Sequence, residues 1–157
     1  GLTTDTVKTL SSTQLNALPA ASVTALSTAQ VAALTTSQVG NLNAALISAL
    51  STSQVGGMTT AQVAALTTAS VVALTATQVG SMSTSQVAAL TTSQVQALET
   101  ADIVALSTGQ VKALTTSQVA AMEVADLKAL SSTQVNALTA TQIGALTGAQ
   151  LIGLMGK

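Results

Sequence analysis

The sequence predicts an all-α fold, an elongated solenoid of very short capped helices with one helix per eight-residue repeat. Leu or Met occupies every eighth position from Leu2 to Leu154. Ser or Thr follows that residue in 15 of 19 complete repeats, and Gln usually stands three positions further on. About half of the residues are apolar (48%) and only 6% are charged, so the chain has the side chains to build a core.

Each repeat, or octad, has eight positions that we letter a to h, with the consensus L-[S/T]-T-small-Q-V-x-A, as in 34–41. One continuous helix does not suit this period, because eight residues turn the apolar stripe by about 80°. A helix that restarts in every octad does suit it. Position b is then the N-cap and position e is the third helical residue, which together form the S/T-x-x-Q capping box.

Two further features favour the capped helix. Leu at position a and Val at position f take the places of the hydrophobic staple, as with Leu34 and Val39. Positions b and e also change together, which predicts that the residues at these two positions are in contact. The four octads without Ser or Thr at b all lack Gln at e, and they carry the pairs Pro19/Ser22, Asn43/Leu46, Glu99/Asp102 and Glu123/Asp126.

The octads must stack to be stable. A helix from c to h has about six residues, which is too short to persist alone. Ordering eight residues costs about 12 kcal/mol, whereas burying one Leu or Val stabilises by about 1.5–3 kcal/mol. We therefore expect neighbouring octads to bury the residues at a and f. Glycines at g and h, such as Gly40 and Gly57, are predicted to end helices.

Taken in order, the chain predicts a single octapeptide-repeat solenoid over residues 1–157. The first octad, 2–9, is irregular and is predicted to act as a cap. Octads three, six and nine lack Gln, and so do octads thirteen and sixteen, so the change recurs at every third octad within each series. This spacing predicts three octads per coil, a 24-residue coil, with two octads per coil as an alternative. The alternative fold is a β-solenoid, because Thr and Val favour strands.

The composition excludes several functional classes. The net charge is −1 and no aromatic residue is present, so the usual features of nucleic-acid binding are missing. No apolar run reaches the roughly 20 residues that span a bilayer. His, Cys, Arg and Tyr are absent, which argues against an enzyme. No cofactor or small-molecule substrate is predicted.

The candidate sites are few. Glu99, Asp102, Glu123 and Asp126 are the only clustered acids, and in a 24-residue coil they would lie on adjacent coils. Their carboxylates form a weak candidate Ca²⁺ site, and the alternative is that they favour helix N-termini. The Thr and Ser positions could form a flat hydroxyl and methyl face that binds a ligand, a surface or ice.

Two resemblances follow from the repeat itself. The stretch L-T-x-x-Q-V-x-A, as in 90–97, resembles the first helix of the DNA-reading repeats of TAL effectors over eight residues only. The period of eight departs from that family, so no function is carried over. The whole-chain pattern resembles octapeptide repeat tracts of large bacterial secreted or surface proteins. This resemblance implies a stalk, spacer or filament role in an extracellular or cell-surface location.

We therefore expect a non-enzymatic structural repeat region. Low charge and an apolar end, 151–157, favour end-to-end or lateral self-association. The alternatives are a ligand-, surface- or ice-binding face on the same scaffold, and a Ca²⁺-stabilised adhesin segment.

Overall fold

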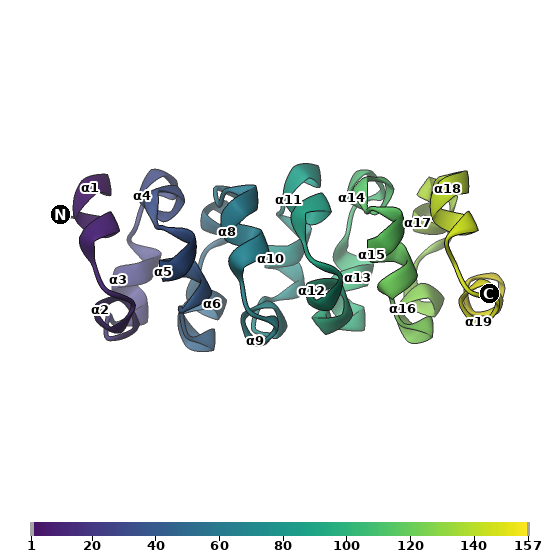
Figure 1. Cartoon of the computed structure of the whole chain (residues 1–157), viewed down its shortest axis with the longest axis horizontal. Helices are drawn as coiled ribbons and strands as arrows, with labels where there is room; N and C mark the ends of the chain where they lie inside the picture. The colour runs from purple at the N-terminus through teal and green to yellow at the C-terminus, as the bar shows by residue number, and fades with distance from the viewer. Residues whose placement is uncertain (1, 157) are drawn as a thin grey trace.

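A computed structural model describes residues 2–156 as a row of short α-helices wound around one long axis (Figure 1). One helix falls in each complete octad. The helices are α1 (Thr4–Thr9), α2 (Ser12–Asn16), α3 (Ala20–Thr24), α4 (Thr28–Ala33), α5 (Thr36–Gly40), α6 (Ala44–Ala49), α7 (Thr52–Gly56), α8 (Thr60–Ala65), α9 (Thr68–Val72), α10 (Ala76–Gly80), α11 (Thr84–Ala89), α12 (Thr92–Ala97), α13 (Thr100–Ala105), α14 (Thr108–Ala113), α15 (Thr116–Ala121), α16 (Val124–Ala129), α17 (Ser132–Ala137), α18 (Ala140–Gly144) and α19 (Gly148–Met155).

The predicted capping box starts most of these helices. In α8, the backbone amide of Gln62 donates to Thr59 Oγ1 at 3.2 Å, and the backbone amide of Thr59 donates to the side-chain oxygen Oε1 of Gln62 at 2.8 Å. Every octad with Gln at e forms the same reciprocal pair. The box satisfies two backbone donors that a helix start leaves free. The prediction of one capped helix per octad is confirmed, except that α3, which begins after Pro19, has no side-chain cap.

Glycines stand at the ends of α5, α7, α10 and α18, as predicted, but they do not form left-handed caps. No residue from 2 to 156 has a positive φ. In the regular octads the Leu at position a turns the chain instead. Leu66 is extended (φ −59°, ψ 138°), and its amide donates to the Val63 carbonyl at 3.2 Å. The helix therefore stops where the next Leu turns into the core.

The core is a single apolar cluster that runs from Val7 to Leu154. It consists almost entirely of the residues at a and f, as the staple pattern predicts. The helical path brings both positions to the inside of the coil, so apolar burial continues along the whole rod. The alternative β-solenoid is wrong, because the structure has no strand between residues 2 and 156.

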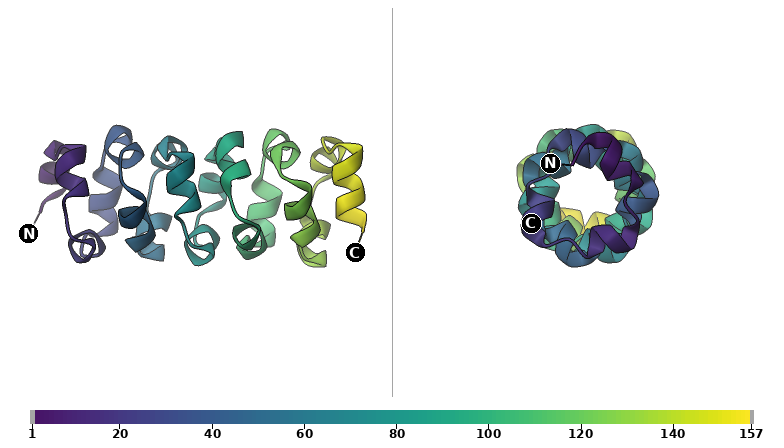
Figure 2. Two further views of the ribbon diagram at one scale, coloured as in Figure 1. Left: turned by 90° about the horizontal axis from the view of Figure 1, so that it is seen from below. Right: turned by 90° about the vertical axis from the view of Figure 1, so that its left-hand side faces the viewer.

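The coil is longer than the predicted three octads. Seen along the axis, the helices form a ring (Figure 2). Each helix packs against the third helix before it and the third after it, as α5 does with α2 and α8. The side chain at e, however, reaches 28 to 31 residues back, to the junction between two helices of the preceding coil. One coil therefore takes between three and four octads, and equivalent octads spiral around the axis.

Candidate functional site

The Gln at position e joins successive coils as well as capping its own helix. In α12, Gln94 Oε1 accepts a hydrogen bond from the Thr91 amide at 2.7 Å. Its Nε2 faces the preceding coil and donates to the carbonyls of Val63 at 2.9 Å and Leu66 at 2.7 Å. A longer contact of 3.4 Å reaches the Ala64 carbonyl. The oxygen of the Gln94 side-chain amide thus accepts a hydrogen bond within the octad, and its NH₂ group donates hydrogen bonds to the preceding coil.

We call these side chains and the carbonyls they contact the glutamine seam. In every octad with Gln at e except that of Gln14, Nε2 donates to the preceding coil. The donors are Gln30, Gln38, Gln54, Gln62, Gln78, Gln86, Gln94, Gln110, Gln118, Gln134, Gln142 and Gln150. The acceptors are carbonyls at the places where helices of the preceding coil end, and some of them, such as that of Val63, also accept a backbone amide. The seam therefore holds each coil to the next by directed hydrogen bonds in addition to apolar packing.

The seam is shielded from water. Gln94 is 2% exposed, and most other seam glutamines are equally buried. No buried side-chain nitrogen or oxygen between residues 2 and 156 lacks a hydrogen-bond partner. A buried amide left without a partner would cost about 1–3 kcal/mol. The arrangement therefore gives each coil one preferred position on the coil before it.

Sequence reasoning predicted the capping role of these glutamines and missed the contact between coils. The missed observation is that position e carries Gln in 13 octads and never Glu. A capping box accepts either residue. Only Gln brings an N–H donor to the neighbouring carbonyls, whereas Glu would bring negative charge.

A different polar contact takes over where Leu46 stands at position e. Leu46 is buried and cannot accept the amide of Asn43. That amide donates instead to Asn16 Oδ1 in the preceding coil, at 2.8 Å. Asn16 Nδ2 in turn donates to the Asn41 carbonyl at 2.7 Å. The bond between coils is kept here, but the side chain comes from the earlier coil.

The four predicted carboxylates lie on two packed helices without forming a metal cluster. Helices α13 and α16 are in contact, as the sequence predicted for adjacent coils. Glu99 and Glu123 are exposed N-caps, whereas Asp102 and Asp126 are buried at position e. Among residues 2–156, no group of three or more His, Cys, Asp or Glu side chains is placed to hold a metal ion.

The two aspartates keep the capping contact of the glutamine they replace. Asp102 Oδ2 accepts the Glu99 amide at 2.9 Å, and Asp126 Oδ2 accepts the Glu123 amide at 3.3 Å. The predicted contact between positions b and e is confirmed in both. Burial raises the pKa of Asp102 above its ordinary value. The nearby Glu99 charge adds to this rise, whereas the hydrogen bond from the Glu99 backbone opposes it.

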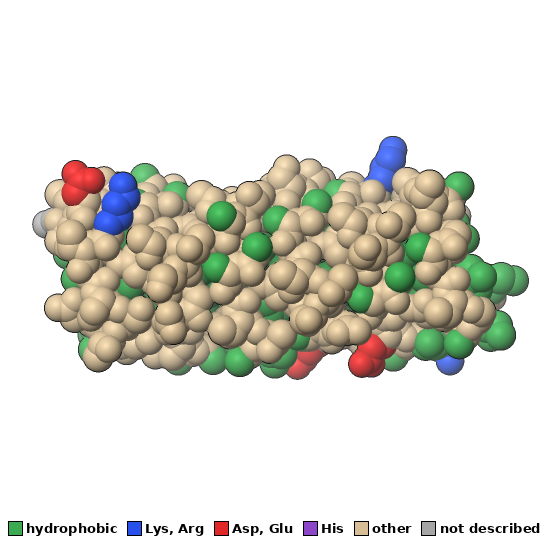
Figure 3. Space-filling view, viewed as in Figure 1, with side chains coloured by type: hydrophobic (Ala, Val, Ile, Leu, Met, Phe, Trp, Pro, Cys, Tyr) green, Lys and Arg blue, Asp and Glu red, His purple; other side chains and the backbone are tan. Residues whose placement is uncertain are grey.

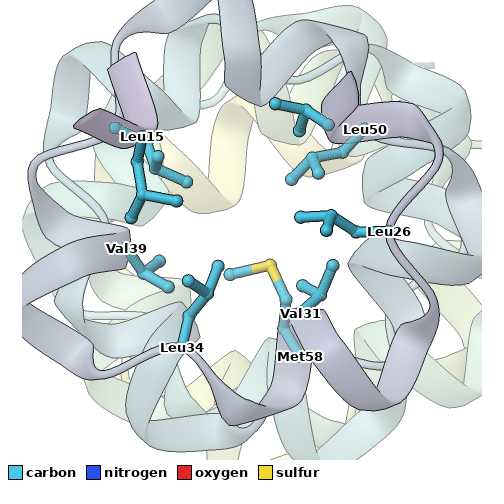
Figure 4. Close-up of a pocket in the computed structure, with 9 residues that line it drawn as sticks. Leu15, Leu26, Val31, Leu34, Val39, Leu50 and Met58 are labelled. Atoms are coloured by element: carbon cyan, nitrogen blue, oxygen red, sulfur yellow. The ribbon is translucent and has the colours of Figure 1, made fainter. Parts of the chain in front are cut away.

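The axis of the rod is filled by apolar side chains. Leu and Val from successive coils, with Met58, point inward from the ring of helices (Figure 4). The cavity between them measures about 10 Å³, room for no more than about one water molecule. Its lining is Leu15, Val23, Leu26, Val31, Leu34, Val39, Leu42, Leu50 and Met58. The axis is therefore a packed core.

The surface is polar and almost uncharged, with isolated acidic and basic side chains (Figure 3). Thr35, Thr36 and Ser37 are exposed, as in most octads. Because a coil is not a whole number of octads, these hydroxyls spread around the rod instead of lining one flat face. None of the helices between residues 2 and 156 has the length and apolarity to cross a membrane.

Comparison with protein families identifies a family of repeats. The model of the ALTTAQ repeat matches five successive segments: 15–44, 40–68, 68–100, 95–124 and 119–155. Each match begins 24 to 28 residues after the one before it, so each spans several octads. No curated protein and no solved structure matches the chain. Since the family model covers nearly all of the sequence in tandem, the chain belongs to the ALTTAQ repeat family.

Proposed function

We propose that this chain is a rigid, non-enzymatic rod that serves as a stalk or spacer in a bacterial surface or secreted protein. The observation that carries the proposal is the glutamine seam beside an unbroken core. Hydrogen bonds have a preferred direction, so they resist sliding and bending between coils in a way that apolar contact alone does not. Repeat proteins of this kind gain length by adding units, since each unit contacts only its neighbours.

The surface also supports a spacer role. Its exposed Thr and Ser side chains bind water and carry little charge. Charged partners are therefore not attracted over long distances. The resemblance to octapeptide tracts of large bacterial surface proteins supports the proposed extracellular or cell-surface location.

Distances between paired spin labels test the rod. The chain has no cysteine, so Ser37→Cys combined with Ser93→Cys, and Ser37→Cys combined with Ala149→Cys, direct labels to exposed sites. Position 149 is twice as far from position 37 along the chain as position 93 is. In a rigid rod, the distance between labels at 37 and 149 is twice the distance between labels at 37 and 93, and both distance distributions are narrow. A flexible chain increases it only about 1.4-fold, and that outcome would overturn the proposal.

We further propose that rods associate end to end or laterally. Ile152 and Met155 on α19 are 74% and 79% exposed, and apolar side chains gather at that end of the rod (Figure 3). Exposed apolar surface of this kind favours contact between molecules. Sedimentation velocity across a concentration series tests this. The double variant Ile152→Ser/Met155→Ser should sediment as a monomer where the wild type associates, and equal behaviour of both chains would exclude this end as the contact.

A further inference from the structure

The junction between α13 and the preceding coil has Asp102 in place of the Gln that donates in the glutamine seam, as the junction of α16 has Asp126. By the spacing of the seam, Asp102 stands opposite the carbonyls of Val71, Val72 and Leu74, which lie 31, 30 and 28 residues earlier. No side chain of residues 2–156 donates a hydrogen bond to any of these three carbonyls. The acceptors are in place, and an ionised carboxylate has no hydrogen to offer them.

Asp102 is confined to this junction. It is 3% exposed, and its Oδ2 is held by the Glu99 amide at 2.9 Å. The Asp side chain is one methylene shorter than Gln, and its second carboxyl oxygen is the atom left to face the preceding coil, as Oδ1 of the equivalent Asp126 faces Thr100. A protonated carboxyl group carries one O–H donor and keeps an acceptor oxygen, which is the same division of roles as in a Gln amide.

We propose that Asp102 makes the contact between α13 and the preceding coil depend on pH. When Asp102 is ionised, the carbonyls near the end of α9 have no side-chain donor and face a negative charge. When Asp102 is protonated, its hydroxyl donates to them, and the seam continues through this coil.

Asp126 provides a comparison within the same chain. Its Oδ1 accepts a hydrogen bond from Thr100 Oγ1 at 3.0 Å, so its ionised form already has a donor from the preceding coil. The residue at the same spacing before Asp102 is Ala76, which has no hydroxyl group. The two aspartates are alike in octad position and burial, and of the two Asp126 alone has a hydroxyl donor from the preceding coil.

The charged surroundings of Asp102 are simple. Helix α10, on one side, has no titratable residue. Helix α16, on the other side, carries Asp126 and Lys128, with Glu123 as its N-cap. Glu99 caps α13 itself. Helix α9, whose end provides the acceptor carbonyls, carries no charge.

The direction of the pH effect follows from the raised pKa. Because the folded chain holds the Asp102 proton more tightly than the unfolded chain, protonation stabilises the fold. This stabilisation is complete below the ordinary Asp pKa of about 3.9 and is lost as the pH rises through the higher folded value. Acidification from neutral pH should therefore strengthen this junction.

Asp102→Asn tests the proposal, because Asn offers a permanent donor of the same size. Its melting temperature should exceed that of the wild type at pH 7, and the difference should shrink as the pH falls toward 4. Asp126→Asn should raise the melting temperature at pH 7 by less, since Thr100 already donates a hydrogen bond to that carboxylate. Asp5→Asn, at an exposed site on α1, removes one charge without adding a donor between coils, so it is the control for net charge and should give no gain in melting temperature at pH 7.

Two outcomes would overturn the proposal. One is an Asp102→Asn chain that is no more stable than the wild type at pH 7. The other is a difference of the same size at pH 7 and pH 4. If Asp102→Asn fails to fold, ¹³C NMR titration of the wild-type carboxyl groups decides the matter. An Asp102 midpoint at or below the ordinary value would contradict the proposal, and a midpoint clearly above it would support it.

Discussion

Neighbouring octads place Gln94 and Asp102 at equivalent sites, and only the first is bonded to the coil before it. Both side chains are buried, and both accept the amide of their N-cap residue. Gln94 also donates to two carbonyls of the preceding coil, at 2.9 and 2.7 Å, which Asp102 does not. The comparison shows that starting a helix and joining two coils are separable tasks. An acceptor oxygen is enough for the first, whereas the second needs an N–H or O–H donor.

The largest expected effect comes from removing a side chain that performs both tasks. Gln94→Ala should lower the free energy of unfolding by about 3 kcal/mol, because it removes the partner of the Thr91 amide and the side-chain donor to the Val63 and Leu66 carbonyls, of which that of Val63 keeps only the Leu66 amide. Gln14→Ala is the matched control, since Gln14 caps its helix and its Nε2 makes no hydrogen bond to another coil among residues 2–156. Its cost should be about 1 kcal/mol. Urea unfolding followed by circular dichroism measures both.

Gln94→Glu separates the two tasks at one site. Glu keeps the acceptor for the Thr91 amide and brings no N–H donor to the preceding coil. Gln94→Glu should therefore lower the free energy of unfolding by most of the amount that Gln94→Ala does. If Glu restored wild-type stability, the bonds between coils would contribute little and capping alone would explain the glutamines.

A second test concerns how closely the coils approach. A Cβ atom added at Gly40 would lie 2.8 Å from the carbonyl oxygen of Ala65, whereas one at Gly144 would meet nothing within 4 Å. Gly40→Ala should therefore destabilise the chain by about 2 kcal/mol, since backbone would have to move. Gly144→Ala should stabilise it by about 0.5–1 kcal/mol through helix propensity alone. Thermal melting should show a lower melting temperature for Gly40→Ala and a higher one for Gly144→Ala. A higher melting temperature for Gly40→Ala would show that the coils are less tightly packed than described.

The smallest effect is expected where Asn16 replaces the glutamine contact. Asn16→Ala removes the acceptor of the Asn43 amide and the donor to the Asn41 carbonyl. Water can partly replace both bonds at this more exposed site, so the expected loss is about 1 kcal/mol. Asn136→Ala, at the same octad position but exposed, is the control and should be neutral. Hydrogen exchange of the Asn43 amide should rise in the first variant only.

Much of the fold could be predicted from the sequence because the evidence for it is local. A capping box connects residues three apart, and a staple connects residues five apart. The sequence of one octad therefore determined where each helix starts, which residues are buried and that the octads must stack. The linked changes at positions b and e, as in Glu99 and Asp102, correctly indicated a contact.

The tertiary structure decided what depends on the path of a whole coil. The partners of Gln94 Nε2 lie 28 to 31 residues away, so no single octad contains them. The glycines were assigned to helix ends because a local rule favours that role. Gly40 does end α5, but it also makes room for the carbonyl of Ala65, which belongs to the following coil. The coil length depends on the angle between helices that pack side by side, and that angle follows from side-chain packing between coils, which the octad repeat alone does not specify.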